Sequence, residues 1–359
     1  MKTTQISQLQ ETVRSSERLM VKGAGSKPAL SSYKVDCESV DLTGLSGMLE
    51  YQPDEFTFTA LAGTRLSDVK AALDEHNQYL PFDPPFVERG ATLGGTVAAG
   101  LSGPGRYRYG GLRDFLLGVA YIDGKGDLLR AGGKVVKNAA GFDIAKLMIG
   151  SLGCYGALVE LTFKVFPRPP AYATLRASYP SFEAAMSALV TLSTSPLEIF
   201  ALDLSPDADF TGLLVRLGGI PDSFAERAER IQAILQSEQV EILQGGVEEE
   251  IWRSRREFYW VPDGAALVKA PLTPKRALKL HEVLSAGGAD VQYSAGANLG
   301  WIAWQEPLEE LEALLVEQKL AGLKIFGENG SPRLGVRVGD TFARRVKAAL
   351  DPTNRWVEV

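Results

Sequence analysis

Glycine, serine and lysine residues gather early in the sequence in a pattern suited to binding phosphate. Gly23-Ala24-Gly25-Ser26-Lys27 follows a short apolar stretch that ends at Lys22. Glycines permit positive φ, so successive backbone N–H groups can converge on an anion, while Ser26 and the lysines add a hydroxyl and positive charge. A Rossmann site needs a helix at this point, and Pro28 with the polar run after it gives no helical periodicity. The loop is either an ordinary tight turn or a phosphate loop of another kind.

A second segment, residues 90–103, is lined with small residues at nearly every position. Its backbone can closely approach a flat or bulky ligand, and residues 94–99 can form a short helix whose N-terminal amides face that ligand. The alternative is a close-packed turn and helix, which glycine makes costly in backbone entropy. The candidate site residues here are Ala91, Thr92, Gly94, Gly95, Thr96, Ala98, Ala99, Gly100 and Gly103.

Three further segments carry candidate ligand-binding residues. The arginines of residues 106–114 can pair with phosphate or an anionic flavin, and a solvated basic loop has the same composition. Residues 137–143 lead into a helix that Asp143 can cap. Residues 150–159 form a turn entering a strand whose edge can pair with an adenine or flavin ring. The candidates are Arg108, Tyr109, Gly110, Arg113, Asp114, Asn138, Gly141, Asp143, Gly156, Leu158 and Val159.

The elements that must position these segments are short strands and helices, divided by prolines at 167–170. After this joint, alternating strands and helices predict two related α+β units that form one antiparallel sheet with helices on one side. In the first half we expect strands at 19–22, 56–61, 115–123 and 157–166 and a helix at 67–76. In the second half we expect strands at 171–179, 199–204, 213–217, 240–243, 265–270, 291–294, 301–304 and 324–326, and helices from 181 and at 223–235, 274–284 and 308–320.

Composition excludes several classes of protein. The chain of 359 residues is long enough for two domains, and its net charge of -6 argues against nucleic acid as a ligand. No apolar stretch is long enough to insert into a membrane, and the N-terminus lacks a signal core, so we expect a cytoplasmic protein. Cys37 and Cys154 are too few for an Fe–S cluster and are either free thiols or a disulfide.

Taken in order, these segments resemble the FAD-binding domain of the vanillyl-alcohol-oxidase (PCMH-type) family over about residues 18–170. Residues 133–147 are similar to its glycolate oxidase (glycolate dehydrogenase) group. The chain length and the pair Trp252 and Arg256 resemble the E subunit of that group. The motifs that carry the resemblance are Val21–Ser26, Ala62–Leu66, Leu80–Pro84, Ala91–Gly103 and Arg108–Asp114. The third of these motifs adds Pro84 to the candidate FAD-binding residues.

The resemblance implies an α+β fold. A PCMH-type FAD-binding domain of two α/β subdomains would occupy residues 1–168, and a cap domain with an antiparallel sheet covered by helices, ferredoxin-like and duplicated, would occupy residues 169–335. Residues 336–359 would return to the FAD domain. Asp351-Pro352 is similar to the Asp-Pro that ends many members, although Thr353-Asn354-Arg355 replaces the usual Asn-Pro-Gly.

The resemblance also implies that FAD accepts a hydride from glycolate or D-lactate, which becomes the 2-oxo acid. Catalytic relatives use a histidine-rich cluster, often with a metal, whereas His281 is the only histidine after the joint. We therefore expect no metal site and no complete substrate site, leave the catalytic residues unassigned, and name Arg256 and Lys269 as candidates for binding a substrate carboxylate. The implied partners are a catalytic D-type flavoprotein subunit and an Fe–S subunit, through which the chain would lie peripheral to a membrane.

Several alternatives remain open. Covalent flavin attachment in this family commonly uses His or Cys, but His76 lies in an expected helix and Cys154 suits a packed small residue, so we expect non-covalent FAD. Aromatic residues near Trp252 and Trp301 are a core or a pocket wall. The chain is alternatively a self-contained 2-hydroxy-acid dehydrogenase, with Tyr259 or a carboxylate accepting the proton, or a structural subunit with a vestigial flavin site.

Overall fold

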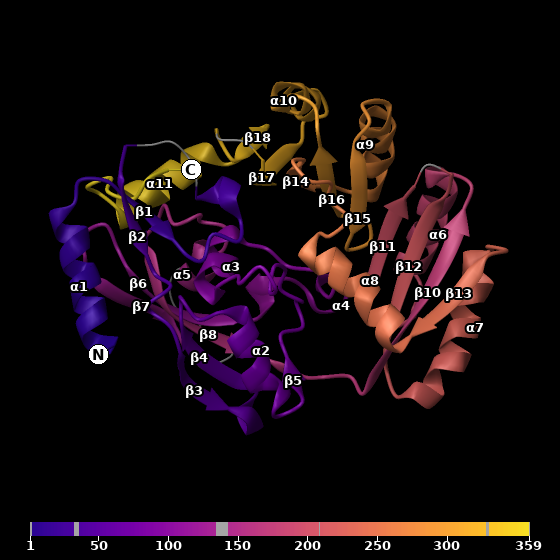
Figure 1. The fold of residues 1–359 in the computed structure, drawn as a ribbon, viewed down its shortest axis with the longest axis horizontal. Coiled ribbons are helices and arrows are strands. Elements are labelled where there is room, and N and C mark those ends of the chain that lie inside the picture. The colour runs from indigo at the N-terminus through magenta and orange to yellow at the C-terminus, as the bar shows by residue number, and fades with distance from the viewer. Residues whose placement is uncertain (1, 32–35, 134–142, 208, 328–329, 359) are drawn as a thin grey trace.

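A five-stranded antiparallel sheet forms the centre of the first half of the molecule (Figure 1). The computed structural model describes residues 2–31, 36–133, 143–207, 209–327 and 330–358. Alternating side chains bury both faces of this sheet, because Leu158 joins one core cluster while its neighbour Val159 joins another. In spatial order the strands are β3 (Met48–Gln52), β4 (Thr57–Leu61), β8 (Ala157–Lys164), β6 (Leu116–Ile122) and β7 (Leu128–Gly132).

Small elements surround this sheet and position the glycine-rich segments. Strands β1 (Leu19–Lys22) and β2 (Glu38–Asp41) pair in parallel, and β5 (Gln78–Tyr79) pairs with β9 (Phe166–Pro167). The helices are α1 (Lys2–Ser15), α2 (Leu66–Asp74), α3 (Leu93–Ala99), α4 (Arg106–Tyr109) and α5 (Ile144–Met148). Helix α2 and the strands expected at 19–22, 56–61, 115–123 and 157–166 are confirmed to within a few residues, whereas α1 was not expected because so few of its residues are apolar.

The second half is one nine-stranded antiparallel sheet built from two units with the same topology. Each unit runs β-α-β-β-α-β, and each has its strands in the spatial order fourth, first, third, second. The units join where β11 meets β15, at Leu204 and Tyr293. The strands are β10 (Ala171–Tyr179), β11 (Ala201–Pro206), β12 (Thr211–Gly219), β13 (Val240–Gln244), β14 (Ala266–Pro271), β15 (Asp290–Ser294), β16 (Leu299–Trp304), β17 (Ala321–Phe326) and the added β18 (Arg333–Gly335).

Helices cover this sheet as expected, but not on one side only. Four helices pack on the same face: α6 (Phe182–Ser193), α7 (Phe224–Leu235), α9 (Pro274–Ala286) and α10 (Leu308–Glu317). Helix α8 (Gly245–Glu257) lies on the opposite face, where Trp252 packs against Ala201 and Leu214. Its Arg255 is buried and bonds to the buried Asp203 at 2.9 Å. Most residues of α8 are charged, so its sequence has too little apolar periodicity to predict a helix.

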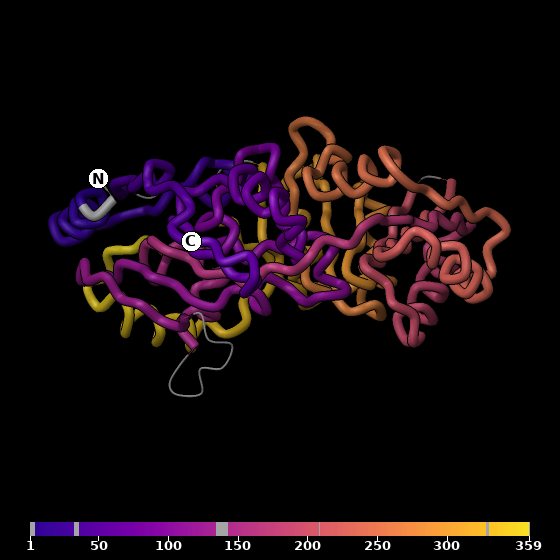
Figure 2. Tube along the Cα trace, turned by 90° about the horizontal axis from the view of Figure 1, so that it is seen from below, coloured from indigo at the N-terminus to yellow at the C-terminus, as the bar shows by residue number. Residues whose placement is uncertain are grey.

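The C-terminal segment returns to the first half, as both views show (Figures 1 and 2). Helix α11 (Asp340–Leu350) leads to Trp356, which pairs in a bridge with Leu19 and joins the buried cluster of α1 residues Leu9 and Val13. The buried carboxylate of Asp351 accepts hydrogen bonds from the backbone N–H groups of Arg355 and Trp356, at 3.0 and 2.8 Å. No described helix is both long and apolar enough to cross a lipid bilayer.

Candidate functional site

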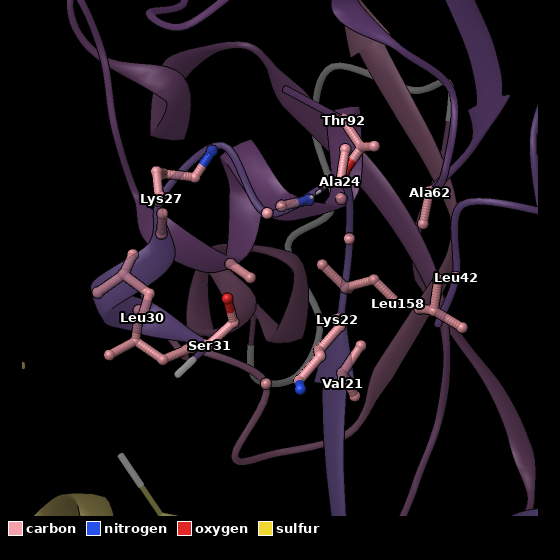
Figure 3. A pocket seen from close by; sticks show the side chains of 18 of the residues that line it. Val21, Lys22, Ala24, Lys27, Leu30, Ser31, Leu42, Ala62, Thr92 and Leu158 are labelled. Carbon is pink, nitrogen blue, oxygen red and sulfur yellow. Dashed lines mark hydrogen bonds between the residues drawn. The ribbon is translucent and has the colours of Figure 1, made fainter. Parts of the chain in front are cut away.

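A groove in the first half collects small residues from segments far apart in the sequence. It runs along the 23–27 loop, helix α3 and the turn before β8, and it holds about 760 Å³ of empty space, part of it open to solvent. In Figure 3, Val21, Leu42 and Leu158 lie on one side of the pocket, Leu30 and Ser31 lie on the other, and Thr92 lies beside Ala24. Aliphatic side chains therefore lie on both sides of the groove. The N–H groups of Leu93, Gly94 and Gly95 in the first turn of α3 already donate within the protein, so they are not free to face a ligand as the sequence suggested.

Close backbone packing shapes the floor of this groove. A Cβ on Gly23 would lie 2.7 Å from the Thr92 Oγ1, and a Cβ on Gly94 would lie 2.8 Å from the Ala62 Cβ. Thr92 caps α3 by accepting a hydrogen bond from the Gly95 N–H at 3.2 Å. Glycine at position 23 thus lets the loop approach the Thr92 side chain, and glycine at position 94 lets α3 approach Ala62.

Lys27 places a positive charge in this groove. Its side chain is buried, its Nζ donates to the Ser26 Oγ at 2.9 Å, and it has no carboxylate partner among the described residues. Desolvation lowers the pKa of the Lys27 ammonium from 10.5 to about 8. A buried cation without a counter-ion is costly unless an anion binds beside it, so the site fits the diphosphate of a dinucleotide.

The structure brings many of the predicted FAD-binding residues to this groove. Gly23 and Gly94 converge there although they come from different elements. The predicted residues that line it are Lys22, Gly23, Ala24, Gly25, Ser26, Lys27, Thr92, Gly94, Gly95, Ala98, Ala99, Gly156 and Leu158.

Other predicted residues lie elsewhere. The guanidinium of Arg108 bonds to Glu198 of the second half at 2.8 Å, and Asp143 caps α5 through the Lys146 N–H at 3.1 Å. Asn138 and Gly141 lie outside the described residues. The remaining predicted residues that do not line the groove are Pro84, Ala91, Thr96, Gly100, Gly103, Tyr109, Gly110, Arg113, Asp114 and Val159.

The groove also contains residues that were not among the candidates. Leu42 comes from a segment without a motif, whereas Ala62 begins the Ala62–Leu66 motif but was not itself a candidate. Ser151, Leu152 and Gly153 belong to the turn before β8, where the small residues of the Gly-Ser-Leu-Gly motif were the available signal. The other additions are Val21, Leu30 and Ser31.

The two candidate carboxylate-binding residues occupy different environments. Lys269 projects from β14 toward the first half, where its buried Nζ donates to the carbonyl oxygen of Gly100 at 3.1 Å. Burial, and repulsion from Arg106, lower the pKa of the Lys269 ammonium to about 8. Arg256 instead lies 3.2 Å from the Asp83 carboxylate, which already neutralises its charge. Of the pair, Lys269 is the cation without an anionic partner in the described structure.

No histidine or cysteine is found among the described residues that line the groove. His281 stacks on Phe182 with ring centroids 3.9 Å apart, and His76 packs edge-on against Tyr51. The buried Cys154 thiol donates to the Ser151 carbonyl oxygen at 2.7 Å, and burial raises the pKa of that thiol. Within the described ranges, no group of three or more His, Cys, Asp or Glu residues is arranged to hold a metal ion.

The groove and its glycine-rich loop fit a dinucleotide, and a second domain with its own sheet lies beside the domain that holds them. This arrangement is typical of the two-domain, dinucleotide-binding flavoproteins. A family model described as an FAD binding domain matches residues 2–132. Alkyldihydroxyacetonephosphate synthase has a similar fold, with a TM-score of 0.71 at 16% identity over 97% of this chain and 73% of its own. This likeness extends over both halves of the molecule.

Curated relatives narrow the class. Glycolate oxidase subunit GlcE of Escherichia coli (strain K12) is 35% identical over 291 residues, which cover 79% of this chain and 78% of that protein. Glycolate oxidase subunit GlcD of Bacillus subtilis (strain 168) is 30% identical over 162 residues, 44% of this chain and 34% of that protein. The chain belongs to the PCMH-type family of FAD-dependent oxidoreductases.

Proposed function

We propose that this chain is the FAD-binding subunit of a glycolate oxidase or dehydrogenase complex. In this role it oxidises glycolate or D-lactate to the 2-oxo acid together with a catalytic D-type flavoprotein subunit and an Fe–S subunit. The observation that carries the proposal is the small-residue groove with its buried Lys27, in a chain that matches a GlcE subunit over most of both lengths. A D-2-hydroxyglutarate dehydrogenase of Xanthomonas citri pv. viticola, 31% identical over 187 residues, supports the same substrate class.

FAD would supply the hydride acceptor, and the chain's own residues would bind and orient it. The backbone N–H groups of residues 23–27 and the Lys27 ammonium would hold the diphosphate, and Leu158 and Ala62 would offer an apolar wall. In this proposal residues 1–168 are the FAD domain, residues 169–335 the cap domain and residues 336–359 a segment that completes the FAD domain.

Non-covalent binding is part of the proposal. It is supported by the absence of any His or Cys from the described lining of the groove. Precipitating the yellow protein with acid or heat tests this point, since non-covalent FAD stays in the supernatant. A yellow, flavin-bearing pellet would contradict it.

Lys269 is the residue we propose for binding the substrate carboxylate, within a substrate site that the partner completes. Its buried ammonium has no anionic partner among the described residues, whereas Arg256 is already paired with Asp83. In Lys269→Met, the affinity of the FAD-loaded protein for oxalate should fall about tenfold or more, because a charge-assisted interaction is lost. Lys269→Arg should keep part of it. Equal oxalate affinity in Lys269→Met and the parent protein would remove Lys269 from this role.

The alternative function, a self-contained 2-hydroxy-acid dehydrogenase, would need Tyr259 as a proton acceptor, and the surroundings of Tyr259 give this role little support. The Tyr259 side chain is exposed, and its hydroxyl already donates to Glu88 at 2.5 Å. The deciding experiment compares dye reduction with glycolate by the purified yellow chain alone and by the chain with its partner subunits. Turnover that requires the partners supports the subunit role, and full turnover by the chain alone contradicts it. A colourless chain from a flavin-replete host would favour a structural subunit instead.

A further inference from the structure

The C-terminal helix α11 carries its aromatic side chain on the outside of the molecule. The ring of Phe342 is 65% exposed, more than any other aromatic side chain in the described structure, and Val338, just before the helix, is 88% exposed. A single exposed apolar side chain is ordinary, but two that lie four residues apart mark a candidate contact surface. In Figure 2, α11 lies along the lower edge of the first half.

The packing of α11 does not explain why Phe342 is exposed. The positions that face the protein recur at helical spacing, as do the exposed ones: 340, 343, 346, 347 and 350 are buried or half-buried, and 341, 342, 344, 345, 348 and 349 are exposed. Lys347 is the one fully buried side chain of α11, and its ammonium bonds to the Asp351 carboxylate and the Trp356 carbonyl oxygen. A helix on a protein surface normally buries its apolar side. In α11 a lysine is buried instead and a phenylalanine faces outward.

Arginines without an acidic partner surround the exposed apolar side chains. Arg337, Arg344 and Arg345 are exposed, and none has a carboxylate within 4.0 Å among the described residues. Between residues 333 and 347 the sequence has five arginines and lysines and one aspartate, which gives a net charge of +4. The whole chain carries -6, so the rest of the chain carries -10 (-6 minus +4). One positive surface on an otherwise negative protein orients that surface toward an anionic partner.

Arginines beside exposed apolar side chains suit the headgroup region of an anionic bilayer. The ring of Phe342 and the methyl groups of Val338 would lie at the boundary with the acyl chains. The guanidinium groups, on long aliphatic stems, would reach the lipid phosphates. A single convex helix face needs no matching cavity to lie on a flat bilayer, which favours a lipid surface over a protein partner.

We propose that the α11 surface, made of Arg337, Val338, Phe342, Arg344 and Arg345, binds the surface of an anionic phospholipid bilayer. The helix lies in the headgroup region and does not cross the membrane. The resemblance implied membrane contact only through partner subunits, whereas the α11 surface gives this chain a contact of its own. The proposal does not rest on the proposed function, because binding to vesicles requires neither glycolate oxidation nor a partner subunit.

The test measures binding of the full, FAD-loaded chain to vesicles by co-sedimentation. Vesicles of equal parts phosphatidylcholine and phosphatidylglycerol are compared with vesicles of phosphatidylcholine alone. The proposal expects binding to the anionic vesicles only, and weaker binding as salt is added, because salt screens exposed charges. In Phe342→Ser the affinity for anionic vesicles should fall about tenfold or more, and in Arg345→Gln about fivefold.

Two exposed residues of the second half provide matched controls. Ile220→Ser removes an apolar side chain that is 66% exposed, and Arg230→Gln removes an exposed guanidinium on α7. Both control variants should bind anionic vesicles as the parent does. Phe342→Ser and Arg345→Gln change exposed side chains, so they should keep the fold and the bound FAD, which circular dichroism and flavin absorbance measure.

Each contrary result overturns the proposal. The proposal is wrong if the parent does not bind anionic vesicles, or if Phe342→Ser and Arg345→Gln bind them as well as the parent does. Equal binding to both kinds of vesicle would reduce the effect to non-specific adsorption. If Phe342→Ser weakens binding to a partner subunit while the parent ignores vesicles, the α11 surface is a protein interface instead. Turnover with glycolate, measured without vesicles, reports separately on the proposed function.

Discussion

Lys27 offers the sharpest test of the FAD groove, because its charge is costly without the cofactor and useful with it. The fall in its pKa from 10.5 to about 8 corresponds to about 3 kcal/mol at roughly 1.4 kcal/mol per unit, which is the penalty that burial imposes on the charged form. Replacing Lys27 by Met removes that penalty. We therefore expect Lys27→Met without FAD to be more stable than the parent at pH 7, by up to about 3 kcal/mol.

The sign of the pH dependence follows from the same shift. The folded-state pKa lies below the unfolded value, so between pH 8 and 10.5 the unfolded chain binds more protons and the parent gains stability as pH rises. The advantage of Lys27→Met should therefore shrink to about 1.5 kcal/mol by about pH 9.5. Urea unfolding at several pH values measures this difference. Lys125→Met, at an exposed lysine in the turn after β6, is the control and should show no such trend.

Lys27→Met should weaken FAD binding, although it stabilises the chain without FAD. Loss of the charge-assisted contact with the diphosphate costs about 1.5–3 kcal/mol, which weakens FAD binding about 10- to 150-fold. Titration of the deflavinated protein, followed by flavin fluorescence, gives the two dissociation constants. The reasoning fails if Lys27→Met is less stable than the parent without FAD and binds FAD equally well. In that case the Lys27 ammonium would neither destabilise the fold by its burial nor contribute to FAD binding.

Three further substitutions test the packing around the groove and the tail. Gly94→Ala places a Cβ 2.8 Å from the Ala62 Cβ and should lower stability by about 1–3 kcal/mol in thermal unfolding, whereas Gly246→Ala, with no neighbour within 4 Å, should be neutral or mildly stabilising. Thr92→Val removes the cap of α3 and should cost about 1 kcal/mol in urea unfolding, with weaker FAD binding; an unchanged midpoint would refute the capping role. Asp351→Asn breaks the buried pair with Lys347, so it should lower the free energy of unfolding by about 3–5 kcal/mol and expose the C-terminus to carboxypeptidase. A tail that stays protected in this variant would contradict the anchoring role of the pair.

Elements with a strong local signal were predictable from the sequence. Residues 171–179 form β10 with the expected bounds, and Ser181 caps α6 by accepting from the Ala184 N–H. In both cases the information lies within a few residues, as alternating apolar side chains or as a capping hydroxyl. Helix α8 was missed because its burial depends on the pairing of Arg255 with Asp203, a contact between distant segments.

The groove shows the same division between local and long-range information. The glycines of residues 23–25 and 94–95 marked one wall, because backbone approach demands small residues wherever it occurs. Leu42 lines the same groove without such a signal, and only the assembled fold brings it there. Arg108 shows the reverse case. The basic composition of residues 106–114 suggested that it binds an anion, whereas the fold pairs it with Glu198 of the second half.

The pairing of Leu19 with Trp356 links the groove to a segment far away in the sequence. The strand that leads into the 23–27 loop is held by residue 356, next to the buried carboxylate of Asp351. A substitution that loosens the C-terminal segment should therefore loosen the support of the groove without altering any residue that lines it.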